Sequence, residues 1–134
     1  MYVEVPRILL IDDDRDIHES VTAILHPHGY RVTCCWTGPS GLAELRRARP
    51  DLLLLDIMLS SPTEGLDLAR EIRGDPEISH TPIVLISAMG RQNHLPGRTE
   101  LPADEYLEKP LTAERLVGSI ERVLRAHGRV KSDQ

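Results

Sequence analysis

The fold is decided by the stretch Pro50-Asp-Leu-Leu-Leu-Leu-Asp-Ile-Met-Leu59, in which four consecutive leucines run into the carboxylate of Asp56. An unbroken apolar run of this length, preceded by a proline, is typical of a strand buried on both faces in the middle of a parallel sheet. Asp56 follows this strand at its carboxyl end. Ligands bind at that edge of open α/β sheets, so Asp56 is the first candidate for a functional residue.

Apolar runs and helical patterns alternate on both sides of this stretch. Besides 52–56, strands are predicted at 7–11, 31–35, 82–86 and 106–107, of which 31–35 is the least apolar and is placed at a sheet edge. Apolar residues at helical spacing follow Asp14, Thr37, Gly65 and Thr112, with Ile17, Val21, Ile24 and Leu25 as the inward stripe of the first helix. This alternation predicts parallel strands with helices on both faces of one sheet.

The segment 89–103 has a poor pattern, and its prolines and glycine leave room for one short helix at most. The last helix is expected to begin at Thr112 and to end at Gly128. One domain is therefore predicted over residues 1–128, and 129–134 is expected to be a polar tail or the start of a linker.

Composition narrows the class of protein. The chain has 134 residues, enough for one domain, and its net charge of −5 argues against direct binding of nucleic acid. No apolar run is long enough to cross a membrane, and no secretory signal is recognised. Cys34 and Cys35 are neighbours on a predicted strand and point to opposite faces, so they are poorly placed to bridge each other. A reducing, cytoplasmic location without membrane contact is expected.

Polar residues end four of the five predicted strands. Asp12 and Asp13 follow the first strand, Asp56 the third, Ser87 the fourth and Lys109 the fifth. Parallel strands place their carboxyl ends at one rim of the sheet, so we expect these side chains to converge. Taken singly, each has an ordinary explanation as a turn or surface residue, but their coincidence at one rim indicates a site.

Three neighbouring carboxylates repel one another unless a cation lies among them. Oxygen ligands alone favour Mg²⁺, and the lack of histidine or cysteine at these strand ends argues against zinc. Opposite the acids, Lys109 would supply a positive charge and Ser87 a hydroxyl. Such a site could hold the oxygens of a phosphoryl group while a carboxylate attacks phosphorus and forms an aspartyl phosphate.

With these residues in place, the chain resembles the response-regulator receiver domains of two-component signalling over nearly its whole length. The motifs that carry the resemblance are Ile11-Asp-Asp-Asp14, Leu55-Asp-Ile-Met-Leu59, Gly65, Ile86-Ser-Ala88 and Tyr106-Leu-Glu-Lys-Pro110. The resemblance implies an α/β, flavodoxin-like (βα)5 three-layer sandwich with sheet order 2-1-3-4-5. The fourth helix would be short or irregular in this chain.

The resemblance also implies a role for each rim residue. Asp56 would be the phosphoacceptor, Lys109 the cation facing the phosphate, and Ser87 a hydroxyl that moves toward it. The metal ligands for Mg²⁺ would be Asp13, Asp12 through water, Asp56 and the backbone carbonyl of Met58. Tyr106 would be the switch aromatic that turns inward together with Ser87, and the Lys109–Pro110 bond would be cis.

The same resemblance describes a signalling switch and not an enzyme with a separate substrate. Its phosphodonor would be a histidine kinase or a phosphotransfer protein, and none of the six histidines would need to carry phosphate. They are interpreted as surface or packing residues. The output partner is not specified by the sequence, and it could include a second copy of the chain on phosphorylation.

The chain departs from the family pattern at three places. The usual proline soon after the acceptor is missing, since Leu59 is followed by Ser60-Ser-Pro62 in a loop one residue longer than usual. Pro102-Ala103 stands where relatives have Gly-Ala before the fifth strand. Pro96-Gly97 interrupts the segment of the fourth helix, which in relatives forms part of the surface that contacts partners.

Two other functions remain open at this point. A phosphatase of the haloacid-dehalogenase type would use Asp12, Asp14, Ser87 and Lys109 but would leave Asp56 without a role. A receiver that no longer accepts phosphate would act as a scaffold.

Two further hypotheses concern the lifetime of the phosphate and the motion of the chain. Apolar Met58 and Met89 would shield the phosphate from water and slow its loss. Residues 91–103 would be mobile without phosphate.

Overall fold

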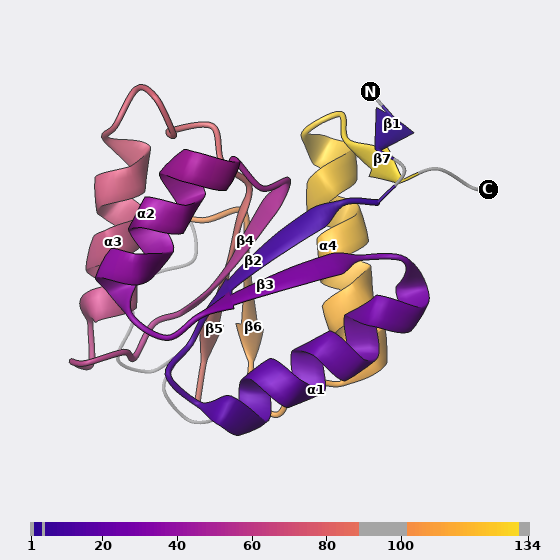
Figure 1. Cartoon of the computed structure of the whole chain (residues 1–134), viewed down its shortest axis with the longest axis horizontal. Coiled ribbons are helices and arrows are strands. Elements are labelled where there is room, and N and C mark those ends of the chain that lie inside the picture. The colour runs from indigo at the N-terminus through magenta and orange to yellow at the C-terminus, as the bar shows by residue number, and fades with distance from the viewer. Residues whose placement is uncertain (1, 4, 89–101, 132–134) are drawn as a thin grey trace.

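The computed structural model describes residues 2–3, 5–88 and 102–131 (Figure 1). Its main sheet has five parallel strands, β2 (Arg7–Ile11), β3 (Arg31–Cys35), β4 (Leu52–Asp56), β5 (Ile83–Ser87) and β6 (Glu105–Glu108). Their order is β3-β2-β4-β5-β6. This is the predicted order 2-1-3-4-5 once the short strand β1 (Tyr2–Val3) is left out of the count. The predicted edge position of 31–35 is also confirmed.

Helices cover both faces of this sheet. The described residues form α1 (Arg15–Leu25), a 3-10 turn η1 (His26–His28), α2 (Gly38–Ala48), α3 (Glu64–Arg73) and α4 (Ala113–Ala126). In Figure 1, α2 and α3 lie on one side of the sheet, and α1 and α4 lie on the other. The three-layer α/β arrangement is therefore confirmed. None of these helices is both long and apolar enough to cross a bilayer.

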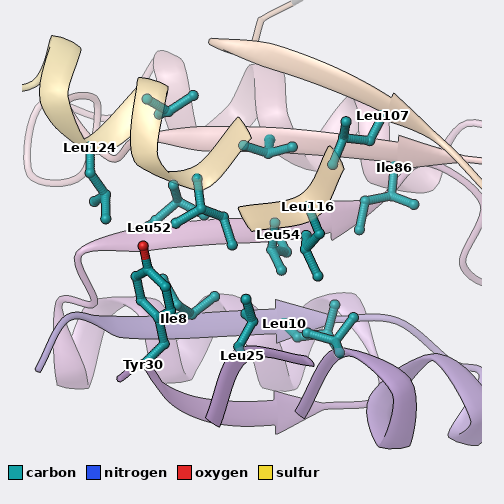
Figure 2. Close-up of a cluster of buried hydrophobic side chains, with 14 residues drawn as sticks. Ile8, Leu10, Leu25, Tyr30, Leu52, Leu54, Ile86, Leu107, Leu116 and Leu124 are labelled. Carbon is teal, nitrogen blue, oxygen red and sulfur yellow. The ribbon is translucent and has the colours of Figure 1, made fainter. Parts of the chain in front are cut away.

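The leucine run in β4 supplies both cores because successive side chains of a strand point to opposite faces. Leu52 and Leu54 pack with α1 and α4, in the cluster drawn in Figure 2. Leu53 and Leu55 pack with α2 and α3 in a second cluster. All four are fully buried, and each such side chain contributes about 2 kcal/mol of hydrophobic stabilisation. The central strand therefore fixes the position of Asp56 from both sides.

The predicted helix starts are confirmed at two threonines. Thr37 caps α2 by accepting a hydrogen bond from the backbone N–H of Ser40, and the Ser40 hydroxyl accepts in return from the Thr37 N–H. Thr112 caps α4 by accepting from the backbone N–H of Arg115. Such caps satisfy amides that have no partner within the helix.

The buried face of α1 differs from the expected stripe. Val21 and Leu25 are fully buried as predicted, but the third buried residue of this helix is His18. Ile17 and Ile24 are only partly buried, although they do pack against the core. The helical period explains the difference, because positions 18, 21 and 25 lie on one line along the helix.

Residues 129–131, at the start of the predicted polar tail, contact other parts of the domain. The Arg129 side chain donates to the backbone carbonyls of Pro50 and Asp51, at 3.4 and 3.1 Å. The next residues form β7 (Val130–Lys131), which pairs in parallel with β1. The predicted irregular fourth helix, the role of Met89 and most of the segment 91–103 lie outside the described residues.

Candidate functional site: an acidic cluster at the carboxyl rim of the sheet

The first two acids follow β2. Asp12 is fully buried, and its backbone N–H donates to the carbonyl of Cys35 at the end of β3. Its Oδ1 accepts from the backbone N–H of Asp14 at 2.9 Å, which leaves Oδ2 directed elsewhere. Asp13 is exposed. Asp14 caps α1 by accepting from the N–H of Asp16.

The third acid, Asp56, ends β4 and is only 4% exposed. Its Oδ1 accepts from the backbone N–H of Met58 at 3.1 Å. One carboxylate oxygen from each of Asp12, Asp13 and Asp56 lies within 4.8 Å of the others. The structure thus brings together the acids that the sequence placed at two different strand ends.

Lys109 faces this cluster from the end of β6. Its Nζ lies 3.2 Å from Asp12 Oδ2 and 3.6 Å from Asp56 Oδ2. The lysine backbone is held by a hydrogen bond from its N–H to the Ser87 carbonyl, and its bond to Pro110 is cis, as predicted. One positive charge therefore faces three carboxylates, so the cluster stays negative overall.

Ser87 ends β5 next to the acidic strand, and its hydroxyl is already engaged. Its Oγ lies 2.6 Å from the hydroxyl oxygen of Tyr106, within hydrogen-bonding distance. Tyr106 is half-buried and packs against the core cluster on the α2–α3 side of the sheet. The two predicted switch residues are therefore in direct contact.

The electrostatics of the cluster make Asp56 hold its proton more tightly than an ordinary aspartate does. Burial and the neighbouring charge of Asp12 raise the pKa of Asp56 to about 7, against the opposing effects of Lys109 and the Met58 N–H. The buried Oδ2 of Asp12 accepts no hydrogen bond from the described residues, although Lys109 lies close to it. A buried carboxylate oxygen that faces one ammonium, beside two more carboxylates, fits a small hard cation such as Mg²⁺.

Gly65 lets α3 approach the end of β4. A Cβ at this position would lie 1.8 Å from the backbone carbonyl oxygen of Asp56, closer than any side chain allows. The N–H of Gly65 also donates to the carbonyl of Ile57 at 2.8 Å. Glycine is therefore required here by a close approach of two backbone segments.

The missing proline of the loop after Asp56 has a structural explanation. The backbone N–H of Ser60 donates to Glu64 Oε1 at 2.7 Å, and the Ser60 hydroxyl donates to the same oxygen. A proline at this position would have no N–H to donate. The other oxygen of Glu64 occupies the space above Gly38, at the start of α2. Glu64 therefore holds the loop and lies against the start of α2, an arrangement that was not predicted from the sequence.

His18 was also missed as a residue of this site. Its Nε2 forms a short hydrogen bond with the backbone carbonyl of Asp12, and its ring stacks on Trp36 with centroids 4.0 Å apart. The available signal was its spacing, since positions 18, 21 and 25 share one helix face. The acceptor is a backbone carbonyl, which every residue has, so the sequence could not identify the partner of His18.

The fold and the site define a class: a doubly wound α/β domain whose acidic cluster and lysine meet at the carboxyl rim of a parallel sheet. The chain matches the model of the response regulator receiver domain over residues 8–121, and it belongs to that family. Receiver domains are the signalling switches of two-component response regulators, and the chain is identified as one of them.

Individual relatives agree with this family. The transcriptional activator protein PfeR of Pseudomonas aeruginosa is 38% identical over 130 residues, which cover 96% of this chain and 40% of that protein. The phosphate regulon transcriptional regulatory protein PhoB of the same organism is 33% identical over 121 residues, which cover 90% and 52%. The chain thus spans about half the length, or less, of these two relatives.

Solved structures give the same result. A response regulator from Chloroflexus aurantiacus superposes with a TM-score of 0.83 at 27% identity, covering 91% of this chain and 99% of that one. A CheY-like receiver domain from Methanospirillum hungatei has a TM-score of 0.81 at 26% identity, with coverage of 93% and 98%.

Proposed function

We propose that the chain accepts a phosphoryl group on Asp56, from a phosphohistidine of a histidine kinase or phosphotransfer protein, and that this controls partner binding. The observation that carries the proposal is the approach of Lys109 to both Asp12 and Asp56, with Asp13 in the same cluster. A carboxylate nucleophile, a cation and an acidic metal site are the parts that phosphoryl transfer needs.

In the proposed reaction, an Asp56 carboxylate oxygen forms a bond to phosphorus while the bond from phosphorus to the donor's imidazole nitrogen breaks. The leaving imidazole retains the bonding electron pair. Mg²⁺, held by Asp12, Asp13, Asp56 and the Met58 carbonyl, would neutralise charge on the phosphoryl oxygens. Lys109 would stabilise the same oxygens from the opposite side, because its ammonium already faces Asp56.

The switch would follow from the shared hydroxyl of Ser87. A Ser87 hydroxyl that turns to a phosphoryl oxygen gives up its present geometry with Tyr106. Phosphorylation would therefore loosen the aromatic ring on β6 and change the surface that it helps to form. Apolar Met58 beside the acceptor supports slow hydrolysis, with an aspartyl-phosphate lifetime well above seconds.

The test is incubation with Mg²⁺ and a small phosphodonor such as acetyl phosphate, followed by mass spectrometry of the intact protein and its peptides. The expected result is the gain of one phosphoryl group on Asp56, its absence in Asp56→Asn, and its absence when the divalent ion is chelated. No phosphorylation would indicate a scaffold receiver. Continuous release of phosphate would indicate a phosphatase, which membership of the receiver family does not favour.

A further inference from the structure

We propose that His18 is a positioning residue that fixes the acidic turn Asp12–Asp14 in the geometry needed to bind the cation, and that Trp36 holds its ring in place. This inference rests on the proposed magnesium site. It concerns a residue of α1 that has no place in the phosphoryl chemistry described above.

His18 holds the turn at two points. Its side-chain Nε2 contacts the carbonyl of Asp12, and its backbone N–H donates to the carbonyl of Asp14 at 3.2 Å. A carbonyl oxygen can only accept, so Nε2 carries the hydrogen. These two carbonyls stand on either side of Asp13, the exposed acid of the cluster. The bond to Asp14 is the ordinary first-turn bond of α1, so the contact that histidine alone adds is the one to the Asp12 carbonyl, directly before a proposed metal ligand.

The imidazole itself is tightly constrained. It is 5% exposed, and it lies parallel to the Trp36 ring at an angle of 7°. Trp36 is brought there by the neighbouring strand, because the Asp12 N–H donates to the carbonyl of Cys35, the residue just before it. Asp12 is thus held at its N–H by the end of β3 and at its carbonyl by His18.

The unused nitrogen of His18 argues against a role in packing alone. Its Nδ1 is buried and has no hydrogen-bond partner among the described residues. Burying a polar atom without a partner destabilises a protein, and a leucine or phenylalanine would fill the same space without that cost. The hydrogen bond to Asp12 is what an apolar residue could not supply. Groups that orient metal ligands from behind set metal affinity in this way.

Two variants of His18 distinguish the effect of its hydrogen bond to Asp12 from the effect of its stacking on Trp36. His18→Phe keeps a planar ring that can stack on Trp36 but removes the donor, whereas His18→Gln removes the ring and keeps an N–H. Mg²⁺ binding is measured by calorimetry and by amide shifts of Asp13, and phosphorylation is measured at low and at saturating Mg²⁺. We expect His18→Phe to weaken Mg²⁺ binding about tenfold, and His18→Gln, which loses only the stacked ring, to weaken it about threefold. At saturating Mg²⁺ the phosphorylation rates should converge.

A purely structural role would lower the melting temperature of His18→Phe without changing the Mg²⁺ affinity of the folded protein, and that result would overturn the proposal. Equal weakening in both variants would overturn it as well, because the donor would then not matter. Should His18→Phe fail to fold, Trp36→Leu decides: it removes no proposed ligand, yet it should weaken Mg²⁺ binding about threefold. Wild-type protein that binds no Mg²⁺ would instead refute the proposed metal site.

Discussion

Asp56 is held in a place that raises the pKa of its carboxyl. The folded protein raises the pKa of this carboxyl from 3.8 to about 7, mainly by burial and by the charge of Asp12. The unfolded chain releases the same proton near the ordinary value. Between these two pH values the folded state holds more protons, so its stability should fall as the pH rises. A decrease of stability with rising pH is expected for a cluster of acids that has no cation to compensate its charge.

Asp56→Asn should therefore stabilise the cation-free protein at pH 8, by roughly 2 to 4 kcal/mol, with little difference at pH 4. Urea unfolding in the presence of a chelator measures the effect, and added Mg²⁺ should reduce it. Glu105→Gln is a control of opposite sign. Its hydrogen bonds with Arg122 and Ser119 lower the pKa of Glu105, so this variant should be less stable than wild type at neutral pH. The deficit should shrink as the pH falls, because wild type then loses the same contribution. Parallel pH profiles for Asp56→Asn and wild type would refute the expectation.

A substitution at Gly65 should lower the stability of the domain, because the absence of a side chain there makes room for the Asp56 carbonyl. Gly65→Ala should destabilise the domain by about 2 kcal/mol, since backbone segments must move apart. Gly118→Ala in α4 is the matched control: its Cβ would meet only the end of the Arg122 side chain, at 3.3 Å. It should stabilise the domain by about 0.5 kcal/mol through helix propensity. Denaturant midpoints compare the two, and similar losses in both would contradict this account.

At the scale of elements, the loop between β4 and α3 shows why this chain can do without the family's proline. Ser60 contributes both its N–H and its hydroxyl to Glu64 Oε1. The loop carries Met58, whose carbonyl is a proposed metal ligand, so its shape bears on the site. The serine thus replaces the rigidity of a proline ring with a hydrogen-bonded contact to the first residue of α3.

Replacing Ser60 by proline, the residue type that relatives carry soon after the acceptor, should therefore destabilise this chain. Ser60→Pro removes two hydrogen bonds and is expected to cost about 1 to 2 kcal/mol, while Ser60→Ala keeps the N–H and should cost about half as much. Thermal unfolding ranks the two variants. A Ser60→Pro protein at least as stable as Ser60→Ala would contradict this expectation.

Elements were predictable where a pattern repeats along the chain and were missed where two distant segments meet. The leucine run of β4 and the threonine caps of α2 and α4 are local signals, and the structure has each of them where the sequence predicted it. The contact of His18 with the Asp12 carbonyl was not predictable, because any residue offers the same acceptor. The pairing of β1 with β7 joins segments of only two residues from opposite ends of the chain, too short to show periodicity.

For the whole molecule, sheet order and site follow from one another. Parallel strands in the order β3-β2-β4-β5-β6 place β2 and β4 side by side, so Asp12 and Asp56 become neighbours although they are far apart in sequence. The convergence of acids, serine and lysine was therefore predictable from the strand ends and the order that the family implies. Contacts among the side chains, such as Ser87 with Tyr106, needed the structure.

Arg129 connects two segments at the end of the sheet opposite the acidic cluster. Its guanidinium donates hydrogen bonds from the segment after α4 to backbone carbonyls just before β4. Arg129→Ala should lower the free energy of unfolding by about 1 kcal/mol, since two hydrogen bonds to backbone carbonyls are lost. Hydrogen exchange should also quicken in the last turn of α4, with the rim around Asp56 unchanged. Unaltered exchange throughout α4 would show that this contact does not secure the helix end.

Trp36 is the only tryptophan of the chain, and its indole ring lies flat against the imidazole that contacts Asp12. Indole emission from the unlabelled protein therefore originates at one known point. Any adjustment of the acidic turn around an incoming ion would alter the overlap of the two rings and with it the brightness of the indole. The domain thus contains its own optical probe, through which occupancy could be followed in real time.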